Sequence, residues 1–253
     1  MSIVIKSCCS FILLWGKISF MPVYQKQGKI PSKRHVVFRQ PDGNLYHEEL
    51  FGTEGFSSTS SLIYHLNPPT MVKELGKPYS VKPEGAIDEN LKALSFLGYN
   101  VEPEEDYLKS RKVFMFNDDM QIGIACPSKS MSEYFFKNAD SDEMLFIHKG
   151  SGRCKTMYGT VDFEYGDYVI IPRGTVYTLE FDTEENKILF VESHSPIRTP
   201  KRYRNEYGQL LEHSPFCERD FKLPYNFETH DEQGDFKIMI KKRGLIYPYV
   251  YET

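Results

Sequence analysis

Short apolar runs bounded by turn residues dominate the chain from residue 113 onward. They span 113–116, 122–125, 133–136, 144–148, 154–158, 161–163, 168–171, 176–181 and 187–192. Strands that recur at intervals of about 8–12 residues, with turn residues between them, are typical of β-sandwiches and β-barrels. The pattern therefore predicts a mainly β domain.

The chain before residue 113 is less regular. Two strand-like runs, 35–39 and 45–51, flank a Pro-Asp-Gly-Asn turn sequence at 41–44, and together they predict a hairpin. A further strand is expected over 61–66. The prolines and glycines of 73–85 predict a loop.

One short helix is predicted over 87–97. Leu91, Leu94 and Leu97 would share one face of this helix, and Gly98 supplies a C-terminal stop. We therefore expect residues 21–110 to form a β-rich N-terminal segment with a single helix.

The first twenty residues have a pattern of their own. An apolar run from Cys8 to Trp15 lies between Lys6 and Lys17, and it is shorter than the roughly 20 residues that span a bilayer. No small-x-small cleavage site follows it, but a second methionine, Met21, does. We interpret residues 1–20 as an upstream-start extension outside the fold, with a secretory or anchoring segment as the alternative.

Composition agrees with a β-rich protein and narrows its partners. The 253 residues are 40% hydrophobic and include 18 Phe and 17 Tyr, residue types that favour strands. A net charge of −4 gives no general attraction to nucleic acid or to an anionic membrane, so neither is an expected partner. Five scattered cysteines without a C-x-x-C motif indicate a reducing, cytoplasmic compartment, with Cys126, Cys154 and Cys217 as small core residues.

Residues 143–177 resemble the two sequence motifs of the cupin barrels. Glu143 and Gly150 match the end of the first motif, and Gly166, Pro172 and Gly174 match the second at its spacing. Such glycines allow the tight turns that reverse strands at a barrel rim. The resemblance implies an RmlC-like cupin jelly-roll barrel over residues 111–195.

The ligand positions of these motifs do not carry metal ligands. They fall among residues 136–139 and at Tyr177, where Phe, Lys, Ala and Tyr replace the histidines. Iron and zinc prefer imidazole and carboxylate donors. We therefore expect a degenerate cupin barrel without its metal, in which Glu143 is a rim residue.

A different facial triad is the alternative metal site. His47 and Glu49 would lie on one face of a strand, and His65, His148 or His194 could complete the set, against a simple surface-strand interpretation. A second H-x-E at 230–232 has no histidine downstream of it.

The remaining motifs are weak. Gly150-Ser151-Gly152 is interpreted as a hairpin turn, because no third glycine and no helix follow it. The basic run 198–204 lies beside acidic residues and is interpreted as a solvated loop. The sequence contains no H-E-x-x-H, G-x-S-x-G or P-loop motif.

Beyond the cupin motifs, the sequence resembles the homogentisate 1,2-dioxygenase family in its shorter bacterial form. The segments that carry the resemblance are 31–35, 38–52, 60–70, 135–143, 166–175 and 215–221. It extends over about residues 21–253, and no part of 1–20 takes part in it.

This resemblance implies an oxidoreductase that uses Fe(II) and O2 to cleave the aromatic ring of homogentisate to maleylacetoacetate, in tyrosine and phenylalanine catabolism. It also implies two cupin-like halves, trimer-based homo-oligomers, and an iron site of two His and one Glu in the second half. The catalytic His belongs to that half too. The resemblance therefore assigns no catalytic residue and no metal ligand to this chain, and leaves the substrate-binding residues unknown.

We thus expect an N-terminal fragment, inactive alone, whose second cupin half is missing. Residues 196–253 would be a connecting segment and the start of that half. His213, His230, Asp231 and Glu232 precede the expected iron site and match none of its motif. The competing hypothesis, from a different functional class, is a non-catalytic cupin domain that serves as a binding or assembly module.

Overall fold

The computed structural model describes residues 3–6, 37–55, 57–69, 71–86, 93–224, 230 and 232–252. These residues form β-strands and three single-turn 3-10 helices, and none of them is in an α-helix. The 3-10 helices are η1 (Gly98–Asn100), η2 (Lys201–Tyr203) and η3 (Glu218–Asp220). The protein is therefore mainly β, as predicted.

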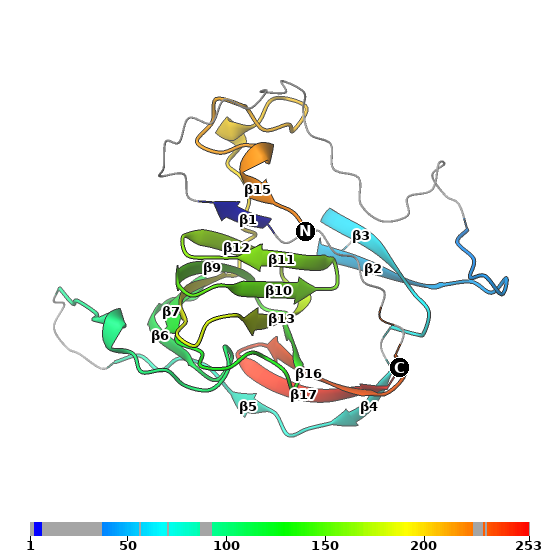
Figure 1. Ribbon diagram of the computed structural model, residues 1–253, viewed down its shortest axis with the longest axis horizontal. Coiled ribbons are helices and arrows are strands. Elements are labelled where there is room, and N and C mark those ends of the chain that lie inside the picture. Colours follow the sequence, from blue (N-terminus) through cyan, green and yellow to red (C-terminus); the bar gives the residue numbers. More distant parts are fainter. Residues whose placement is uncertain are drawn as a thin grey trace.

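Two large sheets make up the body of the molecule (Figure 1). The seven-stranded sheet runs β15 (Phe221–Lys222), β1 (Ile3–Lys6), β12 (Asp167–Ile171), β9 (Asp142–Lys149), β14 (Lys187–Ser193), β7 (Met120–Ala125), β6 (Arg111–Phe116). The eight-stranded sheet runs β11 (Gly159–Phe163), β10 (Gly152–Thr156), β13 (Val176–Phe181), β8 (Phe135–Asn138), β16 (Asp235–Lys242), β17 (Leu245–Glu252), β4 (Val72–Leu75), and β5 (Tyr79–Ser80) also pairs with β17.

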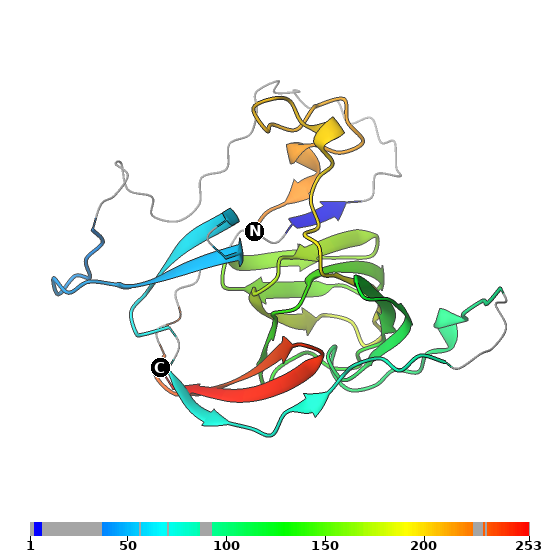
Figure 2. The same cartoon turned by 180° about the vertical axis from the view of Figure 1, so that it is seen from behind.

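A separate hairpin of β2 (His47–Glu54) and β3 (Ser57–His65) extends to one side of the two sheets (Figures 1 and 2). The predicted turn at 41–44 is confirmed, since Arg39 and Leu45 form an antiparallel bridge across it. The long pairing of β2 is nevertheless with β3, the strand that follows it.

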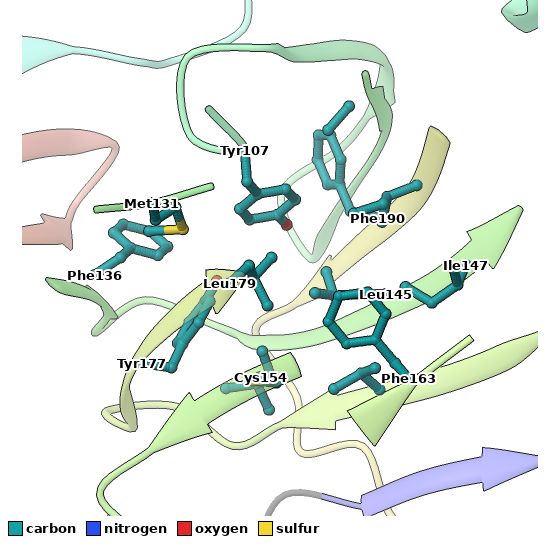
Figure 3. Packing of buried hydrophobic residues seen from close by; sticks show 14 of the residues in the cluster. Tyr107, Met131, Phe136, Leu145, Ile147, Cys154, Phe163, Tyr177, Leu179 and Phe190 are labelled. Atoms are coloured by element: carbon teal, nitrogen blue, oxygen red, sulfur yellow. The ribbon is translucent and has the colours of Figure 1, made fainter. Parts of the chain in front are cut away.

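The hydrophobic core lies between the two large sheets. Alternate residues of the central strands face it, as the period of two in a strand requires; on β14 these are Ile188, Phe190 and Glu192. Figure 3 shows side chains from both sheets meeting there, with Phe190 and Leu145 from one sheet and Tyr177 and Leu179 from the other. Among the described residues no strand pair links the two sheets, so they form a sandwich and not a closed barrel.

Each of the nine strands predicted after residue 112 overlaps an observed strand. The runs 133–136 and 154–158 are displaced by two residues from β8 and β10, and the others lie within their strands. The alternation of apolar runs and turns was therefore a reliable guide to this part of the chain.

Two predictions before residue 112 are wrong where the structure describes them. Residues 93–97, the second half of the predicted helix, form no helix, and residues 87–92 lie outside the described residues. The predicted loop 73–85 contains most of β4 and all of β5, which both pair with β17.

Both ends of the chain contribute strands to the sheets. Residues 3–6 form β1, which pairs with β12 and β15, whereas we expected residues 1–20 to lie outside the fold. The hairpin β16–β17 joins β8 in parallel and extends the eight-stranded sheet, whereas we expected 196–253 to begin a second half. No helix in the described part of the chain is long and apolar enough to cross a membrane.

Candidate functional site

The positions that match the cupin ligand motifs come together between the two sheets. Tyr177 is the cross-strand partner of Phe136, and its Oη donates a hydrogen bond to Oε2 of Glu143 over 2.8 Å. Asn138 Nδ2 donates to Oε1 of Glu192 over 3.1 Å. The motif alignment therefore identified side chains that share one location in the fold.

A buried cluster of four charged residues occupies this location. Glu143 of β9 and Glu192 of β14 lie opposite each other in register, and Arg111 of β6 donates to both carboxylates. The distance from Arg111 Nη1 to Glu143 Oε1 is 3.2 Å. Lys241 of β16 pairs with the second oxygen of Glu192. We call Arg111, Glu143, Glu192 and Lys241 the buried charge cluster.

All four side chains of the cluster are nearly inaccessible to water. Glu143 is 0% exposed, Glu192 1% and Lys241 4%, and the side chain of Arg111 is 9% exposed. Glu143 is therefore a core residue, and the expectation that it lies at a barrel rim is wrong. Isolated charges at such depth would be very unfavourable, so mutual pairing is what allows them to be buried.

Burial and charge act differently on the two carboxylates. Burial raises the pKa of Glu143 above its usual value, although Arg111 opposes the shift. Burial also acts against the charge of Glu192, but Arg111 and Lys241 together outweigh it and lower the pKa of Glu192 to about 2. Glu192 is therefore the fixed anion of the cluster, and Glu143 is the group more easily protonated.

Aromatic rings enclose the cluster on the core side. The Arg111 guanidinium lies 4.0 Å from the centre of the Phe190 ring and 5.4 Å from that of Tyr107. Contacts of this kind stabilise a desolvated cation. Tyr107 is fully buried, and its hydroxyl has no hydrogen-bond partner among the described residues.

The residues of the cluster do not fit an iron ion. Fe(II) in oxygenases takes imidazole and carboxylate ligands with open positions, whereas here both carboxylates already bind cationic side chains. Arg111 and Lys241 supply the positive charge that a metal would supply, and an added cation would be repelled by them. Chemically, these ion pairs can link β6, β9, β14 and β16 and keep charged side chains buried.

The alternative triad is formed only in part. His65 Nε2 lies 2.9 Å from Oε2 of Glu49, and His65 is also the cross-strand partner of His47 on the β2–β3 hairpin. The hydrogen bond from His65 lowers the pKa of Glu49. Among the described residues, no group of three His, Cys, Asp or Glu is placed to hold a metal.

The other histidines considered as third ligands lie elsewhere. His148 stacks edge-on against Tyr99 at 5.1 Å between ring centres, and His194 Nδ1 lies 2.7 Å from the carbonyl oxygen of Asp118. His213 and His230 are exposed, His230 contacts Glu232, and residue 231 lies outside the described residues.

The remaining sequence predictions near this region are simpler to place. Cys126, Cys154 and Cys217 are buried free thiols, as expected of core residues. The basic run 198–204 contains η2, and its Arg198 pairs with Glu54 over 2.8 Å at the surface.

Sequence reasoning missed three members of the buried charge cluster. Glu192 could have been found, since it continues the inward alternation of Ile188 and Phe190 on a predicted strand. Arg111 precedes the predicted strand 113–116, and Lys241 lies in a segment that we took for a connection. Nothing in the local sequence indicated that either cation is buried, because their burial depends on the strand pairing.

A family model described as "Homogentisate 1,2-dioxygenase N-terminal" matches residues 111–252, more than half of the chain. This chain belongs to that family. The matched region begins at β6 and ends at β17, so it contains the whole buried charge cluster and the β16–β17 hairpin.

Curated relatives agree with this assignment. A candidate dioxygenase of Saccharolobus solfataricus is 40% identical over 87% of this chain and 56% of its own length. The homogentisate 1,2-dioxygenase of Pseudomonas putida strain F1 is 25% identical over 86% of this chain and 51% of its own length. The chain thus spans about half the length of the curated relatives that it matches.

Solved structures match a smaller part of the molecule. A cupin-2 domain protein of Shewanella frigidimarina aligns with 33% of this chain and 79% of its own, at 21% identity and a TM-score of 0.30. A salicylate 1,2-dioxygenase mutant of Pseudoaminobacter salicylatoxidans, in complex with gentisate, aligns with 36% of this chain and 27% of its own, at 10% identity and a TM-score of 0.30.

Proposed function

We propose that this chain is the structural, iron-free part of a homogentisate 1,2-dioxygenase-type enzyme and is inactive on its own. Its fold would be a degenerate cupin jelly roll in which the buried charge cluster takes the place of the metal. The observation that carries this proposal is the bridge from Arg111 to both Glu143 and Glu192, because it puts a fixed cation between the carboxylates that a metal would need.

The complete enzyme would cleave homogentisate with O2 to maleylacetoacetate, as part of tyrosine and phenylalanine breakdown in the cytoplasm. Fe(II) would be bound by residues outside this chain, in a second cupin-like half, and the protomers would form trimer-based oligomers. The contribution of this chain would be a rigid sandwich on which the second half and neighbouring protomers assemble.

The direct test is iron loading followed by an oxygen-uptake assay. The purified chain is incubated with Fe(II) without oxygen and desalted, and bound iron and homogentisate-dependent O2 consumption are measured. We expect neither stoichiometric iron nor turnover. The Pseudomonas putida homogentisate 1,2-dioxygenase, treated identically, is the positive control, and stoichiometric iron with turnover in this chain would overturn the proposal.

The DNA downstream of the Thr253 codon tests the link to a full enzyme. A continuation, in frame or after a frameshift, that encodes two His and one Glu at ligand spacing would support it. A gene that closes at this codon, in an organism with a separate complete enzyme, would favour the binding or assembly module.

A further inference from the structure

A depression of about 640 Å³ lies between the β16–β17 turn and the loops that follow β8, β12 and β14. This volume is in the range of small-molecule sites, roughly 300–1,000 Å³. The charged residues that line it are Lys82, Asp118, Asp140, Arg173, Lys242 and Arg243, with His194 beside them. Phe116 and Pro83 supply an apolar wall.

Three of the lining cations are unpaired. The side chains of Lys82, Lys242 and Arg243 make no ion pair or hydrogen bond with any described residue. Some surface cations elsewhere do pair with carboxylates, for example Lys73 with Asp235 at 2.9 Å and Lys155 with Glu180 at 2.6 Å. The depression thus brings together three cations that have no such partner among the described residues.

Arg173 adds a fourth cation that is held in place. One of its terminal nitrogens donates to the backbone carbonyl of His194, and its Nε is buried without a partner among the described residues. A carbonyl orients a guanidinium but does not neutralise it. Arg173 therefore still carries an uncompensated positive charge.

The two carboxylates of the depression do not cancel these charges. Asp140 accepts hydrogen bonds from the backbone N–H of Arg243 at 2.6 Å and of Gly244 at 2.9 Å, so it stabilises the turn. Asp118 is exposed at the edge. Four cations against two carboxylates make this a positive site in a chain whose net charge is −4.

The turn presents Arg243 at a conformational cost. Arg243 has φ 54° and Gly244 φ 69°, the left-handed pair of a two-residue hairpin turn in which Asn-Gly is preferred. Arg243 is the only non-glycine residue with positive φ in the described part of the chain. Backbone strain of this kind is concentrated at ligand-binding sites, and the two hydrogen bonds that Asp140 accepts from the turn maintain it here.

We propose that this depression binds a small organic anion, a carboxylate or a phosphate ester. Arg173, Lys242 and Arg243 would hold its charged oxygens, and its apolar part would contact Phe116. Charge-assisted hydrogen bonds from guanidinium and ammonium groups are the strong ones for such oxygens. The site is separate from the buried charge cluster, and its occupancy does not depend on ring-cleaving activity.

The test is titration calorimetry of the purified chain at low salt with benzoate, phenyl phosphate and inorganic phosphate. We expect at least one aromatic probe to bind with a Kd below about 1 mM, and more weakly in 0.5 M NaCl because the contacts are ionic. The Kd values of benzoate and phenyl phosphate distinguish a carboxylate site from a phosphate-ester site. The Kd values of phenyl phosphate and inorganic phosphate measure the contribution of the apolar wall.

Two variants and a matched control localise the binding. Lys242→Gln and Arg243→Asn should each weaken it at least tenfold, while Lys237→Gln, an exposed lysine on the same strand β16, should leave it unchanged. Arg243→Asn creates the preferred Asn-Gly turn and should keep or raise the melting temperature, so lost binding cannot be ascribed to unfolding. Absence of binding by all three probes, or equal effects of K242Q and K237Q, would overturn the proposal.

Discussion

Glu143 and Glu192 are direct cross-strand neighbours on β9 and β14, and both carboxylates are buried in the core. Like charges opposite each other destabilise a sheet even at its surface, and the repulsion increases in a low-dielectric interior. Arg111 donates to both groups and Lys241 pairs with Glu192, so two cations balance two anions. The central strands of the seven-stranded sheet therefore depend on cations supplied by an edge strand and by the other sheet.

Replacing Arg111 should be strongly destabilising. In Arg111→Met the two carboxylates would lose their shared partner, and removing one member of a buried pair costs about 3–5 kcal/mol. Urea unfolding of wild type and variant at pH 7, followed by circular dichroism, measures the loss in free energy of unfolding.

A second substitution and a surface control make this prediction specific. Arg111→Met with Glu143→Gln should recover part of the loss, because Glu192 and Lys241 then form a neutral pair. Lys112→Met removes an exposed pair with Glu104 and should cost less than about 1 kcal/mol. If R111M lost no more unfolding free energy than K112M, the cluster would not stabilise the sheet as we infer.

The strands around this cluster could be predicted from local sequence, and its charge pairing could not. The inward positions of β9 and β14 are apolar except at one end of each strand, where Glu143 comes first on β9 and Glu192 comes last on β14. Alternation therefore predicts that Glu143 and Glu192 are buried. It does not say that the two are neighbours, or that a cation distant in sequence lies between them.

The errors before residue 112 have a related physical cause. Residues 72–75 and 79–80 are exposed and lack strand-like alternation, and they are strands because β17, far along the chain, pairs with them. Leu94 and Leu97 suggested a helical face, but both are exposed, so they do not provide the buried apolar face that stabilises a helix. Non-local pairing decides such segments, and a single sequence does not contain it.

The cluster predicts opposite pH dependences for its two carboxylates. Glu192 has a pKa of about 2 in the folded state against an ordinary 4.5, so its stabilising contribution is present above pH 4.5 and is lost as pH falls toward 2. The difference in unfolding free energy between wild type and Glu192→Gln should therefore become smaller as the pH falls from 4.5 toward 2. Urea unfolding at a series of pH values measures it.

Glu143 provides the internal comparison. Its pKa is raised in the folded state, so protonated Glu143 contributes to the free energy of unfolding at low pH. This contribution is lost as the pH rises through the folded pKa. Glu143→Gln should thus gain stability relative to wild type with rising pH, whereas E192Q should lose it. Parallel curves for the two variants would contradict the assignment.

Tyr177 is expected to stabilise the cluster through its hydroxyl. Tyr177→Phe removes the donor to Glu143 and leaves a buried carboxylate oxygen unsatisfied, at a cost of about 1–3 kcal/mol. Tyr165→Phe, at a position that is 72% exposed, is the matched control and should have no measurable effect. Thermal unfolding of both variants and of wild type measures the effect. Equal melting temperatures for Y177F and wild type would show that the hydrogen bond contributes nothing to stability.

Gly123 on β7 controls how closely the strands approach beside Arg111. A Cβ at this position would overlap the Lys112 carbonyl oxygen and the Phe190 ring, and that ring packs against the Arg111 guanidinium. Gly123→Ala should therefore displace both side chains and cost about 1–3 kcal/mol, the usual range for overpacking.

The control for this substitution is Gly85→Ala, where an added Cβ meets only the Phe116 ring at 3.8 Å. G85A should leave the melting temperature nearly unchanged. Because Gly123 acts through Arg111, G123A and R111M should also be non-additive when combined. Strictly additive losses in the double variant would mean that Gly123 supports the sheet without supporting the cluster.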